Sequence, residues 1–460
     1  MANPSLTEYI AQSQRGLYQS VFGPEYLMKQ SYFQVDVTGA TGIFDATYGR
    51  KVWQALNNQT RFFNAIPRVV WGNTAGWRVR TDRGSGRSRP VTEVGSLPTV
   101  DISDIQTVSS LPRITATTFG ASVKSVFTAQ LEGGVGDVLA LENENAQLDH
   151  VKEINEELLA GSMYYNEGTA DTGFEVNASV AKSFKVGDKV TIWDTSDNAW
   201  EDTSGMEVGA VNTTTGVVTF ADSATSTDAQ AAGDLIAIYS RAGFTSIDDV
   251  VAENGMMIGG GDAHANFDDA GVRAYDLTYS GSGTRTAGGW NAAAHVSSNS
   301  GTGRDLSLNL IDTCIQKIRE NGGEPKLMLM GHDQYFKLER LLNSQQRYMG
   351  QEEYQVGVGS ERTFPGTRTG LVLATYMGIP ILPDADVPKS VDSSGTLLGS
   401  NVYVLDTDYI EMAVAQPTQY VENRDYFAAT QLVVRGLLYT MGEMRVKNIW
   451  VQAKITDLNA

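Results

Sequence analysis

Residues 78–89 read Arg78-Val-Arg-Thr-Asp-Arg-Gly-Ser-Gly-Arg-Ser-Arg89, with five arginines and one aspartate among twelve residues. On both sides of this stretch apolar and polar residues alternate, at 69–71 and 77–79 before it and at 91–94 after it, which is typical of strands. The pattern predicts a long, cationic β-hairpin with glycines at its tip. Because such a hairpin has little core of its own, we expect a partner to cover it.

The body that carries this hairpin is strongly acidic. The 460 residues contain 54 acidic and 35 basic side chains, a formal net charge of −19, and 13 of the basic residues are lysine. An acidic, lysine-poor surface stays solvated at high salt, which favours a salt-loving source, although an ordinary acidic protein fits as well. The same charge argues against a chain that binds nucleic acid over its whole surface, because such binding needs a basic face.

The cysteine count and the hydropathy pattern restrict the class of protein further. One cysteine, Cys314, excludes a disulfide framework within the chain. The N-terminus has no apolar signal core, and no apolar run has the length of a membrane helix. We therefore expect a protein that is made and folded in a cytoplasm.

Composition and periodicity divide the chain into seven segments. They are an arm over 1–45, a helix over 46–67, the extended hairpin over 68–111, a strand and long helix over 112–164, an inserted β domain over 165–243, an α/β domain over 244–412 and closing strands over 413–460.

The long helix is predicted over 137–160, with Asp137 as its N-cap and Gly161 as its C-terminal stop. It follows a β-branched strand pattern at 114–127. One side of the helix is apolar and is expected to pack on a sheet of the same subunit. The apolar positions are Val138, Leu141, Leu148, Val151 and Leu158.

The insertion at 165–243 consists of short strand patterns separated by Asn, Thr, Ser and Gly, which predicts a small β-barrel or sandwich. Between 165 and 240 it carries 12 acidic and 3 basic residues, so we expect it to face solvent.

The α/β domain contains a helix that Asp305 or Ser307 caps, an Asn321-Gly-Gly turn, a strand over 326–330 and a second helix that Asp333 caps. A polar loop is expected over 354–369. The remaining strands are predicted at 370–374, 379–382, 402–405, 409–414, 432–439 and 449–455.

The order of these elements resembles the major capsid proteins of tailed viruses, which have the Hong-Kong-97-type shell fold. The resemblance rests on the helix at 137–160, the helix-Gly-Gly-strand unit at 305–330, Met377-Gly-Ile-Pro-Ile-Leu382, and 402–408 followed by Leu432-Val-Val-Arg-Gly436. It implies an α+β fold with an N-terminal arm, an extended hairpin (E-loop), a spine helix, and peripheral and axial domains. It also implies hexamers and pentamers of an icosahedral shell around double-stranded DNA. The acidic balance suggests a virus of a haloarchaeon.

The cationic hairpin has three interpretations: a solvated loop, a hook for nucleic acid, or a clasp between subunits. The resemblance favours the clasp, because in that family the hairpin lies across the neighbouring subunit. Arginine forms bidentate bonds to carboxylates, which suits such a contact. The predicted contact residues are Arg78, Arg80, Arg83, Arg87 and Arg89. Some members of the family form a lysine–asparagine cross-link from the hairpin, but no lysine occurs between Lys51 and Lys124. We therefore predict a non-covalent clasp.

No catalytic, cofactor-binding or metal-ligating residues are predicted, and the chain is not expected to be an enzyme. The Asp262-Ala-His264 stretch has too few further ligands for a metal site, and Cys314 lies among isoleucines, as a core residue does. The expected partners are other copies of the chain, a separate scaffold, a portal, minor capsid or turret proteins, and packaged DNA bound without sequence specificity on the inner face; no membrane is involved. The expected location is the virion, assembled in the host cytoplasm. The alternatives are an encapsulin-like compartment shell, a β-rich surface or binding protein and, more remotely, a hydrolase.

Overall fold

The structure is a computed structural model. It describes residues 60–72, 76–80, 88, 90–98, 100, 102–103, 105–124, 138–168, 172–194, 199–200, 206–221, 232–252, 292–299, 301–343, 351–355, 363–367, 375–392, 394–423 and 432–460. The predicted arm over 1–45 and most of the predicted helix over 46–67 lie outside these residues. The chain divides into two compact units, one of 1–58, 116–150 and 419–438 and the other of 59–115, 151–418 and 439–460.

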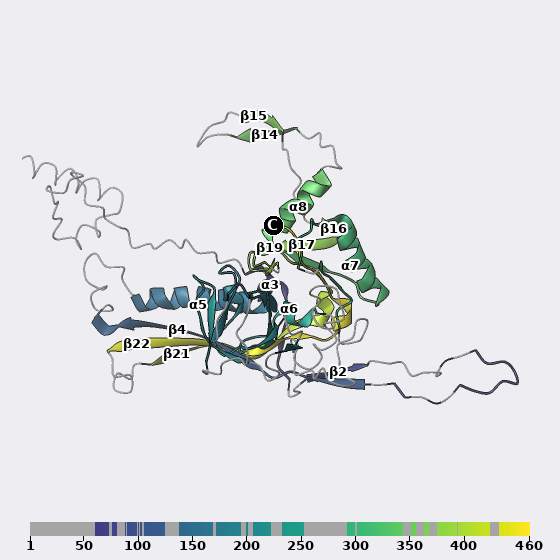
Figure 1. Cartoon of the computed structure of the whole chain (residues 1–460), viewed down its shortest axis with the longest axis horizontal. Coiled ribbons are helices and arrows are strands. Elements are labelled where there is room, and N and C mark those ends of the chain that lie inside the picture. The colour runs from purple at the N-terminus through teal and green to yellow at the C-terminus, as the bar shows by residue number, and fades with distance from the viewer. Residues whose placement is uncertain are drawn as a thin grey trace, which may run out of the picture. The chain divides into compact units, whose positions relative to one another are not determined.

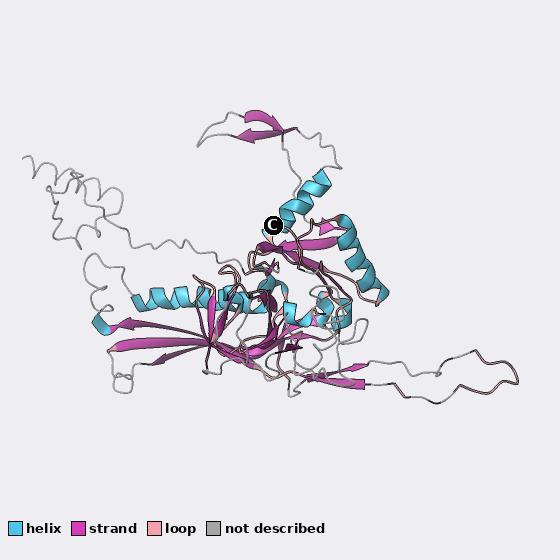
Figure 2. Cartoon of the chain, in the orientation of Figure 1, coloured by secondary structure: helices cyan, strands magenta, loops and turns pink. Residues whose placement is uncertain are grey.

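A four-stranded sheet contains the longest strands (Figure 2). Its order is β1 (Arg68–Val70), β21 (Ile410–Asn423), β22 (Val433–Val446) and β4 (Arg113–Ser122). The first strand pairs in parallel with β21, and Val69 lies opposite Ala413. The strand predicted at 69–71 as a flank of the hairpin therefore belongs to another sheet. Its partner lies so far along the chain that no local pattern indicates the pairing.

The long predicted helix is present as α5 (Val138–Leu158). Its buried row, however, is Ala146, His150, Ile154 and Leu158, at intervals of one helical turn, and Leu148 is 39% exposed. The prediction of Leu148 as a packing residue was wrong, because the buried side includes the polar His150, whose Nδ1 lies 2.9 Å from the Thr117 hydroxyl.

Gly161 has a different role from the predicted helix stop. Its φ is not positive, so it does not form the left-handed cap that the sequence predicted. A Cβ at this position would instead overlap the Tyr164 hydroxyl. The glycine therefore allows Tyr164 to approach the chain closely.

The extended hairpin consists of β2 (Gly76–Arg80) and β3 (Ile105–Ser109), which are antiparallel and place Trp77 opposite Val108. The strand predicted at 91–94 was wrong. A turn forms there because the Gly95 amide donates to the Thr92 carbonyl at 2.9 Å, and the returning strand begins only at Ile105.

The insertion forms one antiparallel sheet around its own core. The strand order is β5-β11-β7-β9-β10-β6, and β8 pairs with β7. The core contains Phe174, Phe184, Val190, Ile192 and Ile236. The bounds are β5 (Met163–Tyr165), β6 (Gly173–Glu175), β7 (Lys189–Asp194), β8 (Ala199–Trp200), β9 (Met206–Val211), β10 (Val217–Phe220) and β11 (Leu235–Ser240), with η1 (Ala181–Ser183) between β6 and β7.

A six-stranded mixed sheet organises the following α/β part, in the order β12-β23-β20-β13-β17-β16. Figure 1 shows α7 and α8 beside its strands β16 and β17. On β13, Met328 and Met330 pack with α7 and α8, whereas Leu327 and Leu329 join the core that contains α5 and α6. The bounds are α6 (Ile247–Val250), β12 (His295–Ser297), α7 (Leu308–Glu320), β13 (Leu327–Met330), α8 (His332–Asn343), β16 (Thr375–Tyr376), β17 (Ile379–Pro383), β20 (Val402–Leu405) and β23 (Ala453–Ile455).

Several local predictions in this part need correction. Asp333 lies in the first turn of α8 rather than at its N-cap, and its carboxylate accepts the Ser400 amide at 2.8 Å. The region predicted as a polar loop contains the antiparallel pair β14 (Gln351–Gln355) and β15 (Thr363–Thr367). The strand predicted at 449–455 begins as η5 (Ile449–Val451), and 370–374 lie outside the described residues. The remaining elements are α3 (Arg61–Ala65), β18 (Lys389–Val391), β19 (Leu397–Ser400) and η4 (Thr407–Tyr409).

Candidate assembly surface and the junction behind it

The predicted contact arginines are only partly within the described residues. Arg78 and Arg80 are exposed on β2, whereas Arg83, Arg87 and Arg89 lie outside the described residues. The side chains that alternate with them, Trp77 and Val79, pack against the main core. The period of a strand thus places the arginines of β2 on the outer side.

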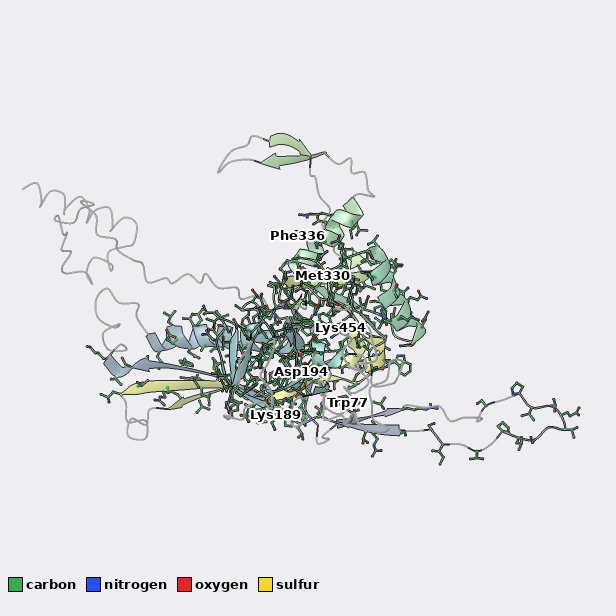
Figure 3. All side chains as sticks on the ribbon, viewed as in Figure 1. Trp77, Lys189, Asp194, Met330, Phe336 and Lys454 are labelled. Atoms are coloured by element: carbon green, nitrogen blue, oxygen red, sulfur yellow. The ribbon has the colours of Figure 1, made fainter. Side chains whose placement is uncertain are left out.

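The returning limb of the hairpin exposes a row of aliphatic side chains that the sequence analysis did not single out. Figure 3 shows the limb extending beyond the labelled Trp77 with its side chains projecting from it. The signal in the sequence that could have indicated this row is the spacing of its aliphatic residues, which recur every two or three positions. The exposed fractions are 43% for Val91, 97% for Val94, 80% for Leu97, 100% for Val100, 85% for Ile102 and 57% for Ile105. Covering one such side chain stabilises a complex by about 1.5–3 kcal/mol, so this row, named here the aliphatic row, outweighs exposed charges as a source of binding energy.

Residues 241–249, named here the junction, connect the inserted sheet to α6, and the sequence did not indicate their importance. Three carboxylates from separate elements accept the backbone amides of the junction. Ala242 donates to Asp188 at 2.8 Å, Phe244 to Glu157 at 3.1 Å, and Thr245 to Glu443 at 2.8 Å. A buried loop needs such partners because its amides cannot reach water.

Burial raises the pKa of all three carboxylates above its ordinary value, and for two of them the raised value lies near neutral pH. Burial raises the pKa of Glu443 to about 7, although Arg113 at 3.0 Å lowers it in part. Burial likewise raises the pKa of Glu157 to about 6, against the opposing effect of a hydrogen bond from Thr115 at 2.6 Å. Protonation of either group near neutral pH therefore changes how firmly the junction is held.

A buried ion pair closes the start of the junction. Arg241 donates to Asp249 at 2.5 Å, and it also donates to the carbonyls of Ser183 at 3.0 Å and Gly161 at 2.8 Å. The Asp249 carboxylate also accepts the Ser246 amide in a capping box that starts α6. One guanidinium thus joins η1, the end of α5 and α6, with its donors satisfied inside the protein.

The contacts of the junction are hydrogen bonds and an ion pair that connect separate elements of the fold. In the described ranges no group of three or more His, Cys, Asp or Glu side chains is placed to hold a metal ion. Cys314 is buried, and burial raises the pKa of its thiol to about 12, so the thiolate is not formed near neutral pH. Among the described helices none is long and apolar enough to span a membrane.

Comparison with known proteins identifies the family to which the chain belongs. A family model of the SU10 major capsid protein matches residues 204–459, which is more than half of the chain. The chain belongs to the SU10 major capsid protein family. It is accordingly a major capsid protein, a structural component of a phage-type icosahedral shell. No curated protein matches this capsid protein.

Solved structures agree at the level of the fold. The capsid protein of cyanophage A-1(L) is similar with a TM-score of 0.53 at 11% identity, covering 91% of this chain and 98% of that one. Gordonia phage Cozz gives 0.44 at 12% identity over 94% and 99% of the two chains. The SrpI encapsulin of Synechococcus elongatus gives 0.38 at 8% identity over 90% and 93%. The first similarity shows that this capsid protein has the fold of a phage capsid subunit, which is the fold that the sequence resemblance implied.

Proposed function

We propose that this capsid protein assembles into hexamers and pentamers of an icosahedral shell that encloses packaged double-stranded DNA. The hairpin acts as a non-covalent clasp on a neighbouring copy. The observation that carries this proposal is the exposure of the aliphatic row beside the exposed Arg78 and Arg80. An exposed apolar surface of this kind marks a site at which another protein binds.

The two limbs of the hairpin contribute differently to the clasp. The limb of Arg78 and Arg80 selects a carboxylate-bearing surface, which the many acidic side chains of a second copy provide. The limb with the aliphatic row supplies the apolar contact area. Many copies of such a contact act together in a shell, so no single interface has to be strong.

The inserted sheet is assigned to the outer face of the shell because of its acidic excess, and the host to the haloarchaea because arginine outnumbers lysine in an acidic chain. DNA contacts the inner face without sequence specificity. A scaffold, a portal and minor capsid or turret proteins are separate partners, and assembly takes place in the host cytoplasm. A melting curve that rises steeply between low and molar salt supports the halophilic origin, and a flat one contradicts it.

The clasp is tested by replacing Arg83, Arg87 and Arg89 with Ser and, separately, Val94 and Leu97 with Ser. Both variants are expected to keep the monomer fold and to lose particles in electron micrographs, with the larger loss for the aliphatic pair. A matched variant replaces the surface residues Lys189, Lys326 and Lys447 with Ser and removes the same charge elsewhere, so its yield of particles should not change. Unchanged yield and salt tolerance in the hairpin variants would show that the clasp is absent.

Purified particles test two parts of the proposal, that the clasp is non-covalent and that the cargo is DNA. A denaturing gel should show a single monomer band, and a ladder of multimers would contradict the non-covalent clasp. DNA in the particles supports a virus shell, whereas protein cargo without DNA supports an encapsulin-like compartment. A monomer at every salt concentration would leave the β-rich surface or binding protein as the better alternative.

A further inference from the structure

The turn between β16 and β17 holds a methionine in a backbone conformation that methionine disfavours. Met377 has φ of 49° and Gly378 has φ of 83°, so the two residues form a two-residue hairpin turn with both φ values positive. Asparagine and glycine are the usual residues of such a turn, and a long side chain at the first position is strained. Met377 is nevertheless 60% exposed, so packing within the chain does not explain its presence.

Met377 forms one wall of a hollow beside α7. The hollow has a volume of about 450 Å³ and is lined by Ile315, Gln316, Arg319 and Glu320 together with Asp312 and Met377. The Tyr376 hydroxyl donates to the Asp312 carboxylate at 2.8 Å, which holds the turn against α7. The hollow is therefore bounded on one side by this turn, and its lining combines the apolar Ile315 and Met377 with charged side chains.

A second exposed apolar side chain lies on α8, a different element of the α/β part. Phe336 on α8, labelled in Figure 3, is 53% exposed. Among the described residues between 292 and 410, Phe336 and Met377 are the two large apolar side chains with this degree of exposure. Phe336, named here the knob, lies on α8, which contacts β19. The hollow lies beside α7, which contacts β12 and β23, so the knob and the hollow are on separate elements.

We propose that Phe336 of one copy inserts into the hollow between α7 and Met377 of the next copy. The inference rests on the proposed assembly and assigns the residues of a contact within each ring of subunits. A knob and a hollow at different places on one chain make a head-to-tail contact, and such contacts form closed rings when the rotation between copies allows it. The methionine sulfur and the aromatic ring form a favourable contact, which explains why methionine is kept in a strained turn.

The charges around the two surfaces match this occupant. Arg319 and Glu320 lie at the edge of the hollow, and Glu339 and Arg340 follow Phe336 by about one turn of α8. The hollow also carries Asp312, and Glu320 is paired with Lys317 of its own chain at 2.8 Å, so Arg319 is the lining cation and Glu339 of the next copy is its expected partner.

The first experiment compares Phe336→Ser, Met377→Asn and the double variant in full-length protein. Each single change is expected to raise the concentration needed for assembly about tenfold, as the loss of a central contact does. Met377→Asn is the decisive variant, because asparagine suits the turn and the monomer remains folded. If the two side chains touch across copies, the double variant assembles no worse than the poorer single variant. Full additivity, or unchanged assembly with Met377→Asn, would overturn the contact.

The second experiment detects the contact directly. The Phe336→Cys, Met377→Cys double variant is assembled under reducing conditions and then oxidised, and the native Cys314 is buried and stays unreactive. A non-reducing gel should show a ladder that ends at the ring size. An equimolar mixture of the Phe336→Cys and Met377→Cys single variants should yield no species larger than a dimer. Each dimer should contain one chain of the Phe336→Cys variant and one chain of the Met377→Cys variant. Particles that form normally and give no ladder would disprove this contact and leave the proposed assembly intact, whereas absence of wild-type particles would disprove the assembly itself.

Discussion

The Lys454 ammonium donates to the Asp248 carboxylate across 2.9 Å in a part of the protein where the lysine side chain has no solvent exposure. The bond joins β23, near the end of the chain, to α6, whose first three residues end the junction. Burial alone would raise the pKa of Asp248, but Lys454, together with hydrogen bonds from Ser162 and Tyr403, lowers it below its ordinary value. The carboxylate is therefore charged inside the core and depends on this one lysine.

Replacing Lys454 with Met should lower the free energy of unfolding by about 3–5 kcal/mol, because an uncompensated buried charge remains. Urea denaturation at pH 7 measures the loss. Adding Asp248→Asn to Lys454→Met should recover part of it, since the charge is then removed. As a matched control, Lys326→Met breaks an exposed pair with Asp408 and should leave stability unchanged. Equal effects of the two lysine changes would mean that burial does not decide the strength of these pairs.

Stability should fall as the pH rises from 4.5 to 7. The pKa values of Glu157 and Glu443 are raised from 4.5 to about 6 and about 7, so in this range the folded state binds more protons than the unfolded state. The contribution of these groups is complete below 4.5 and is lost as the pH passes the folded values, by up to about 1.4 kcal/mol per pH unit and group.

Urea denaturation between pH 4.5 and 8 tests this dependence, and Glu157→Gln is the informative variant. Its amide oxygen can still accept from Thr115 and Phe244, but it no longer titrates. Below pH 6 the free energy of unfolding of the variant should therefore depend less on pH than that of the wild type. A slope that is the same in the variant would assign the pH dependence to other groups.

Two glycines with the same backbone conformation should respond differently to alanine. Gly216 has φ of 82° and Gly322 has φ of 83°, so alanine is strained at both positions, by about 1–2 kcal/mol. At Gly216 a Cβ would also overlap the Val176 carbonyl, whereas at Gly322 nothing lies within 4 Å. Gly216→Ala should cost about 1–3 kcal/mol more than Gly322→Ala in thermal unfolding, as overpacking does. Equal costs would show that the inserted sheet yields at this turn.

The strained turn at Met377 gives a prediction about the monomer alone. Under conditions that prevent assembly, Met377→Asn should leave the free energy of unfolding unchanged or raise it by up to about 1 kcal/mol, because asparagine tolerates a positive φ. Calorimetry of the monomer measures this. A marked loss of stability would mean that Met377 is needed for packing within the chain.

Sequence periodicity predicted the elements whose contacts are close in the chain. The helix α7, its turn at Gly322 and the strand β13 are present because apolar spacing and a glycine with positive φ act locally. The helix α5 was also predicted, and Leu158 is buried as expected, but the rest of the buried row was not predicted, because the neighbours that bury His150 and leave Leu148 exposed come from other parts of the chain. Asp333 was misplaced for the same reason, since its partner Ser400 is distant in the chain, whereas the turn after Thr92 is local and was missed because the alternation at 91–94 resembles a strand.

The candidate site was predicted in outline. The arginines of the hairpin follow from composition, since five of them in one short stretch of an acidic chain are recognisable without coordinates. The exposure of the aliphatic row is different, because valines and leucines at such intervals look the same in the sequence whether they are covered or not. Likewise, no pattern indicates that Asp188, Glu157 and Glu443 converge on one loop.

The sequence by itself determined the local elements, the acidic surface, the cationic hairpin and the order of segments that is typical of capsid proteins, because each depends on neighbouring residues or on totals. Only the tertiary structure decided which side chains are removed from water. The fold places Lys454 beside Asp248 in the core and raises the pKa values of Glu157 and Glu443 by burial. It also leaves Phe336 and Met377 exposed. These properties depend on contacts between residues far apart in the chain, which the free energy of the whole fold selects.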